Sequence, residues 1–141
     1  MPRTEAAMSP ATQGKLSTYQ SVAAHGAVAA ADPYRLVLML LDGALARIAQ
    51  ARVSGAQSAS LEKTQHLQRA LAIVGELRAS LDLTQGPIAR NLDALYDFVS
   101  RQLLLGQSSN DPAVLDTASN VLSELRGGWA AMPQGQGVVR P

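Results

Sequence analysis

The chain of 141 residues contains no cysteine, which excludes disulfides, zinc knuckles and a thiol nucleophile together. Aromatic residues are scarce, with one Phe, three Tyr and one Trp, and no segment alternates apolar with polar residues as a half-buried strand would. The hydrophobic content of 47% consists largely of Ala and Leu, which lose little side-chain freedom in a helix. The composition therefore predicts one all-α domain with a modest core.

A strong charge of either sign is also missing, since the net charge is +1 and the twelve Lys and Arg are scattered along the chain. Nucleic-acid binders cluster their basic residues along the path of the phosphates, so the sequence predicts no nucleic-acid partner. Met1–Ser9 lacks the apolar core of a signal peptide, and the uncharged run Leu16–Ala31 is too polar to span a membrane. We therefore expect a cytoplasmic (cytosolic) protein without stable membrane insertion.

Three internal prolines, Pro33, Pro87 and Pro112, each stand just ahead of a segment with helical periodicity. Proline suits the first turn of a helix because its missing N–H has no partner there in any case. Asp32 and Asp111 precede two of these prolines, and an Asp side chain accepts hydrogen bonds from the free N–H groups of a helix start. Together with the helical spacing of the apolar residues, these signals predict helices over residues 33–52, 60–83, 87–105 and 112–129.

The connections between the four predicted helices are short, and short connections make successive helices antiparallel neighbours. We therefore predict an antiparallel up-down four-helix bundle over residues 32–132, with Gly106 as the C-cap of the third helix. Residues 1–31 are rich in small and polar residues and are expected to form a flexible, partly helical N-terminal arm. Residues 133–141 are expected to be a disordered tail.

Two of the predicted helices carry more apolar residues than one core face requires. Leu36–Leu41 is a run of six that covers the whole circumference of the first helix. The third helix adds Tyr96, Phe98 and Leu104 to its main row, which consists of Ile88, Leu92, Leu95, Val99 and Leu103. Either these helices are covered on all sides, by the bundle or by the arm, or they form an exposed groove for a partner helix. The two interpretations are compatible if the arm covers the groove until a partner displaces the arm.

Catalytic and metal-binding patterns are absent from the sequence. It has no Gly-x-Ser-x-Gly elbow, no phosphate-binding loop and no dinucleotide fingerprint. Glu62 and His66 share a helix face, but a metal site in a bundle needs further ligands from a second helix. Asp93 and Asp97 also share a face, where Arg101 indicates an ion-paired surface. The chain is predicted to be no enzyme and to hold no metal or cofactor.

Four fragments of the chain resemble one family when they are taken together. They are the segment from Tyr19 to Ala44 that contains Met39-Leu40-Leu41-Asp42-Gly43, the segment NLDALYDF at 91–98, the pair Asn110-Asp111, and Trp129. In this order they resemble the flagellin-specific export chaperones of the FliS type, over about Leu16 to Met132. The chain departs from the family pattern at Leu41, where the family commonly has an aromatic residue, at Gln102 in place of a second Arg, and at Gly127-Gly128, which are expected to fray the last helix.

The resemblance implies a chaperone that holds the disordered C-terminal segment of flagellin, prevents premature polymerisation and aids delivery to the flagellar type III export gate. It implies Leu16 and Tyr19 as residues that contact the export gate, although they could equally pin the arm to the bundle. It also implies candidates for the flagellin groove, for each of which core packing is the alternative: Leu36, Met39, Leu40, Leu95, Tyr96 and Val99. A self-associating adaptor bundle remains the other interpretation, and the expected state is a monomer or weak homodimer.

Overall fold

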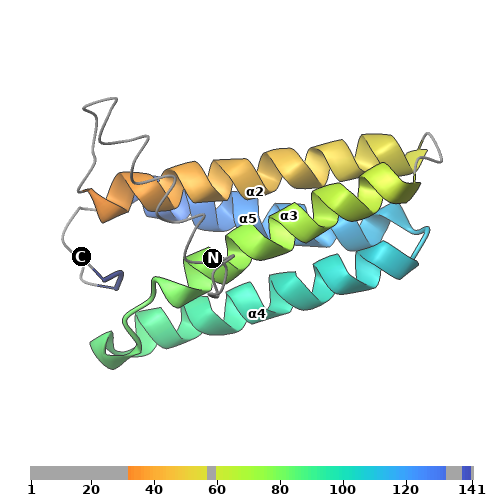
Figure 1. The fold of residues 1–141 in the computed structure, drawn as a ribbon. Helices are drawn as coiled ribbons and strands as arrows, with labels where there is room; N and C mark the ends of the chain where they lie inside the picture. The colour runs from red at the N-terminus through yellow and green to blue at the C-terminus, as the bar shows by residue number, and fades with distance from the viewer. Residues whose placement is uncertain (1–31, 57–59, 133–137, 141) are drawn as a thin grey trace, which may run out of the picture.

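The computed structural model describes residues 32–56, 60–132 and 138–140 of the chain (Figure 1). Its helices are α2 (Pro33–Ala56), α3 (Ser60–Ala79), α4 (Pro87–Ser108) and α5 (Pro112–Ala131), with a short 3-10 turn η1 (Leu83–Gln85) before α4. Each helix packs against the next, and α5 closes the ring against α2. The successive helices run in opposite directions in Figure 1. The predicted antiparallel four-helix bundle is confirmed, whereas the predicted arm lies outside the described residues.

The helix starts follow the Asp–Pro signals of the sequence. The Asp32 carboxylate accepts a hydrogen bond from the Tyr34 N–H at 3.0 Å, and the Asp111 carboxylate accepts one from the Ala113 N–H at 2.9 Å. Each bond satisfies one of the free donors at a helix N-terminus. Ahead of Pro87, the chain turns through Gly86 with φ of +95°, a conformation that glycine adopts without steric cost.

The helix ends differ from the prediction in all four cases. α2, α4 and α5 continue beyond their predicted ends, and neither Gly106 nor the pair Gly127-Gly128 terminates its helix. A glycine inside a helix costs only about 1 kcal/mol, which packing against neighbours offsets. α3 ends earlier than predicted, because Leu81 leaves the helix and pairs with Val139.

Residues 138–140 correct the expectation of a disordered tail. The Asp82 N–H donates to the Val138 carbonyl and the Arg140 N–H donates to the Ser80 carbonyl, both at 2.9 Å. The Val138 side chain is buried. This short segment therefore belongs to the folded part of the chain and adjoins the end of α3.

The core is built mainly from Leu, Ala and Val, which explains how so few aromatic residues suffice. In α2 the residues that face the core are Val37, Leu40, Leu41, Ala44 and Ile48. The core positions of α3 are Leu67, Ala70, Ile73, Val74 and Leu77, whereas Leu61 in its first turn is 71% exposed.

Candidate functional site

Helix α4 carries two apolar rows, and only one of them faces the core. The buried row consists of Ala89, Tyr96, Val99 and Leu103. The second row, called here the α4 stripe, consists of Ile88, Leu95, Phe98 and Leu105, which are 37% to 51% exposed. The main row expected from the sequence combines Val99 and Leu103, which are buried, with Ile88 and Leu95, which are exposed, and it leaves out Tyr96, which is buried. Two rows of helical spacing lie side by side on this helix, and spacing alone does not show which of them faces the core.

Ion pairs between helices show which way the α4 stripe points. Arg78 of α3 pairs with Asp93 at 2.6 Å and with Asp97 at 3.0 Å. These contacts place α3 on the flank of α4 that carries the aspartates. Successive helical residues are rotated by about 100°, which places the aspartates on one side of the buried row and the α4 stripe on the other, towards α5.

Helix α5 presents apolar residues to the same seam. Its polar flank pairs with α2, through Asp116 with Arg52 and through Arg126 with Asp42. Val121 and Leu125 lie on the other flank, where they are half-buried and pack against the core. The α4 stripe and these two residues thus form one apolar surface along the seam between α4 and α5, called here the α4–α5 surface.

The predicted groove residues fall into two groups. Leu40, Tyr96 and Val99 have exposed fractions of 1%, 3% and 0%, so they belong to the core and offer no surface in this state. The other three candidates reach the surface: Leu36 is half-buried, and Met39 and Leu95 are exposed.

Leu36 and Met39 lie apart from the α4–α5 surface. The guanidinium of Arg47 in α2 lies 3.1 Å from Nδ1 of His66 in α3, which identifies the α3-facing flank of α2. Leu36 and Met39 share this flank at about 100° per residue. The groove candidates that reach the surface therefore lie on two apolar surfaces, one beside α2 and α3 and one beside α4 and α5.

The arm residues Leu16 and Tyr19, expected at the export gate, lie outside the described residues. Glu62 and His66, which share a helix face, have different surroundings: His66 faces Arg47, and Glu62 is exposed. Within residues 32–56, 60–132 and 138–140, no group of three or more His, Asp or Glu side chains is placed to hold a metal ion.

The aspartates of α4 form the predicted ion-paired surface. Arg101 pairs with Asp97 at 2.7 Å, one helical turn away. The hydrogen bond from Arg78 lowers the pKa of the Asp93 carboxyl. A carboxylate held in its charged form in this way suits ion pairing and is a poor proton donor near neutral pH.

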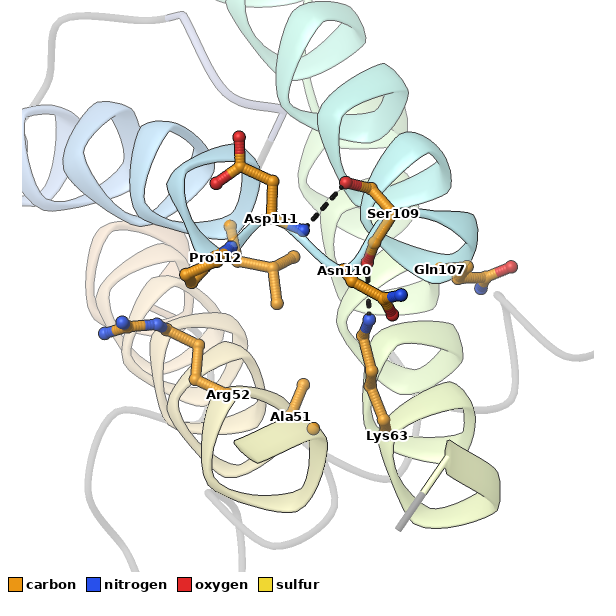
Figure 2. Close-up of a pocket in the computed structure, with 10 residues that line it drawn as sticks. Ala51, Arg52, Lys63, Gln107, Ser109, Asn110, Asp111 and Pro112 are labelled. Carbon is orange, nitrogen blue, oxygen red and sulfur yellow. Dashed lines mark hydrogen bonds between the residues drawn. The ribbon is translucent and has the colours of Figure 1, made fainter. Parts of the chain in front are cut away.

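A pocket of about 610 Å³ lies at the opposite end of the bundle from Trp129 and contains the pair Asn110-Asp111 (Figure 2). Lys63 reaches across from α3 and donates to the Ser109 carbonyl at 2.9 Å, while the Asp111 N–H donates to Ser109 Oγ at 3.0 Å. Arg52 at its rim is paired with Asp116. These contacts join the start of α3 to the connection between α4 and α5, and the end of α2 to the start of α5. The sequence pattern did not predict this junction.

No helix in the described part of the chain is long and apolar enough to cross a membrane. An all-helical bundle with exposed apolar surfaces is typical of proteins that bind other polypeptides. Residues 15–136 match the family described as flagellar protein FliS, and the chain belongs to this family. The family comprises flagellar secretion chaperones and is non-enzymatic.

Three relatives illustrate the similarity. The flagellar secretion chaperone FliSB of Pseudomonas aeruginosa is 37% identical over 81% of this chain and 91% of its own length. The flagellar secretion chaperone FliS of Vibrio cholerae is 34% identical over 86% of this chain and 90% of its own length. The FliS chaperone of Salmonella typhimurium is 33% identical over 84% of this chain and 89% of its own.

Proposed function

We propose that the chain is a cytosolic export chaperone for flagellin. It holds the disordered C-terminal segment of flagellin, prevents premature polymerisation and aids delivery to the flagellar type III export gate. Membership of the FliS family supports the flagellar export role. The observation that carries the binding step is the α4 stripe, a row of four large apolar side chains left exposed on one helix.

The geometry of the α4 stripe suits an amphipathic helix as the bound partner. Ile88, Leu95, Phe98 and Leu105 follow one helix face, and a partner helix buries such a row with its own apolar residues one turn apart. A segment that is disordered when free must bury on the order of 1,000–3,000 Å² to offset its ordering cost. One stripe is too small for this, so we propose that the segment wraps from the α4–α5 surface to Leu36 and Met39.

Substitutions on α4 test the proposal with a control on the same helix. Leu95→Asp and Phe98→Asp should weaken binding of a flagellin C-terminal peptide at least ten-fold by calorimetry, because a charge replaces an apolar contact. Leu104→Asp is the matched control, since Leu104 is 56% exposed but lies on the flank that carries the aspartates. The proposal would be contradicted if the Leu95→Asp and Leu104→Asp variants are both folded by circular dichroism and bind the flagellin peptide equally well.

The second surface is tested in α2. Met39→Asp should weaken binding of the long flagellin segment, whereas Val53→Asp should not, although Val53 is 58% exposed on the same helix. A shorter peptide that covers only the α4–α5 surface should bind the Met39→Asp variant as well as it binds the parent. If Met39→Asp has no effect on the long segment, the partner does not wrap as proposed.

The export-gate step rests on Leu16 and Tyr19, which the resemblance assigns to this contact. Leu16→Ala and Tyr19→Ala should reduce capture of the chaperone–flagellin complex by the cytosolic domain of the gate component. Binding of flagellin itself should stay unchanged. A loss of thermal stability without a loss of capture would instead mean that these residues pin the arm to the bundle.

The alternative of a self-associating bundle uses the same exposed row. In that case, light scattering should give a dimer for the parent and a monomer for Leu95→Asp, with no binding of flagellin at micromolar concentration. Both outcomes together would favour a self-associating adaptor over a flagellin chaperone.

A further inference from the structure

The connection between α3 and α4 presents a short backbone edge that is already paired. Ser80–Asp82 runs antiparallel to Val138–Arg140, with Leu81 opposite Val139 and one backbone hydrogen bond on either side of this pair. Figure 1 shows the C-terminal segment at the end of the bundle where α2 begins and α3 ends. These three residues lie beyond residues 15–136, the part of the chain that matches the FliS family.

The side chains of the segment also take part in the contact. Val138 is 2% exposed, and Val139 is half-buried and packs against the core. The next residue, Arg140, brings a positive charge close to Asp82. The pKa of the Asp82 carboxyl is lowered chiefly by the hydrogen bond from the Thr84 hydroxyl, and the Arg140 cation lowers it further. The edge thus accepts two apolar β-branched residues followed by a base.

We propose that the backbone edge Ser80–Asp82 is a binding site for an extended segment of another protein, and that residues 138–140 occupy it in the free chain. Backbone hydrogen bonds of this kind do not depend on the side chains, so a second strand can replace the first. Specificity comes from the buried valine position and from the charge beside Asp82. The partner segment therefore has an extended backbone, consecutive apolar β-branched residues and a following Lys or Arg.

The covalent link makes the C-terminal segment a built-in competitor. A tethered segment has an effective concentration of about millimolar for a short linker, so a partner binds only by displacing it. The tethered contact is small, consisting of two backbone hydrogen bonds, the buried Val138, the half-buried Val139 and the charge of Arg140 near Asp82. This site is separate from the α4 stripe, and its proposal does not depend on flagellin binding.

A labelled synthetic peptide with the sequence of residues 135–141 tests the site on the full-length chain. The Val138→Asp variant should release the tethered segment and bind the peptide at least ten-fold more tightly than the parent does, by fluorescence anisotropy. Val53→Asp makes the same chemical change at an exposed position of α2 and should bind like the parent. A peptide with Asp in place of its first valine should bind none of them.

A second pair of variants isolates the backbone contact and covers the case that Val138→Asp does not fold. Arg140→Pro removes the N–H that donates to Ser80, whereas Arg140→Ala keeps it. Both lose the charge, so only Arg140→Pro should lose a backbone bond and gain further peptide binding. Equal binding by these two variants, or no binding to any folded variant, overturns the proposal. A chain that is dimeric by light scattering and becomes monomeric in Val138→Asp also overturns it, because the occupant is then a second copy.

Discussion

The indole ring of Trp129 stacks on the phenol ring of Tyr34, with the ring centroids 5.6 Å apart and the planes inclined by 22°. The indole N–H donates to the Tyr34 carbonyl at 3.0 Å, and the Tyr34 hydroxyl donates to the Ala130 carbonyl at 2.9 Å. The contact thus ties the first turn of α2 to the last turns of α5. It holds together two helix ends that no loop connects.

Shortening the Trp129 side chain should destabilise the whole bundle. Trp129 is 7% exposed, so Trp129→Ala should lower the free energy of unfolding by about 3–5 kcal/mol. Trp129→Phe keeps an aromatic ring for stacking but loses the hydrogen bond to Tyr34, and should cost about 1–2 kcal/mol. Urea unfolding followed by circular dichroism measures both. Equal stability of the two variants would show that the ring stack does not hold these ends together.

Arg78 joins α3 to α4 through Asp93 and Asp97, and its contribution should depend on pH. Arg78→Ala should cost about 1 kcal/mol at neutral pH, because all three side chains are partly exposed. The folded chain lowers the pKa of Asp93 below its ordinary value of 3.8, so this stability is present above pH 3.8 and is lost as the pH falls below it. Parent and variant should therefore converge in stability in acid.

Arg69→Ala, at an exposed position of the same helix, is the matched control for Arg78→Ala. Its effect on the free energy of unfolding should be within about 0.5 kcal/mol of zero. A gap between the parent and Arg78→Ala that does not shrink as the pH falls below 3.8 would show that Arg78 acts through packing of its aliphatic chain and not through its charge.

Local signals made the helix starts predictable, whereas distant contacts set several of the ends. Asp32 and Asp111 act on N–H groups two residues away, so the sequence contains the whole cause. The end of α3 depends on Val139, which lies far along the chain from Leu81. No pattern within α3 indicates such a partner, and the helix predicted over residues 60–83 is therefore too long.

The sequence showed a surplus of apolar residues but not which of them form the candidate surface. The excess of apolar residues in the first and third predicted helices left two interpretations open, coverage on all sides or exposure, and the structure contains both cases, since Leu40 is buried and Met39 is exposed. Which apolar residues are exposed depends on the rotation of each helix about its axis. Ile88 and Ala89 are adjacent in the sequence, but Ile88 is exposed and Ala89 is buried. Neighbouring helices set this rotation through contacts such as Arg78 with Asp93. The sequence of α4 by itself holds no such information.

Two helical glycines should respond in opposite ways to the same substitution. A Cβ at Gly106 would lie 2.5 Å from Leu115 Cδ2, so Gly106→Ala requires the buried Leu115 side chain to shift and should lower the free energy of unfolding by about 1 kcal/mol. A Cβ at Gly75 would meet no described atom within 4 Å, so Gly75→Ala should raise it by about 0.5–1 kcal/mol through helix propensity. Close packing against a neighbouring helix is thus found at Gly106 and not at Gly75. Thermal melts of both variants provide the comparison, and a shared sign would contradict the packing described for α4 and α5.

Tyr96 should make the bundle sensitive to alkali. Burial raises the pKa of Tyr96 to about 12, from an ordinary value of 10.0. The unfolded chain releases this proton at lower pH than the folded chain does, so the stabilisation is complete below pH 10 and is lost as the pH rises towards 12. The full loss is roughly 3 kcal/mol, since one pKa unit corresponds to about 1.4 kcal/mol.

Tyr96→Phe keeps the ring in the core without an ionisable group, so urea unfolding at pH 8 and pH 11 should show a smaller loss for the variant than for the parent. Equal losses would mean that the Tyr96 phenol ionises as readily in the folded chain as in the unfolded one.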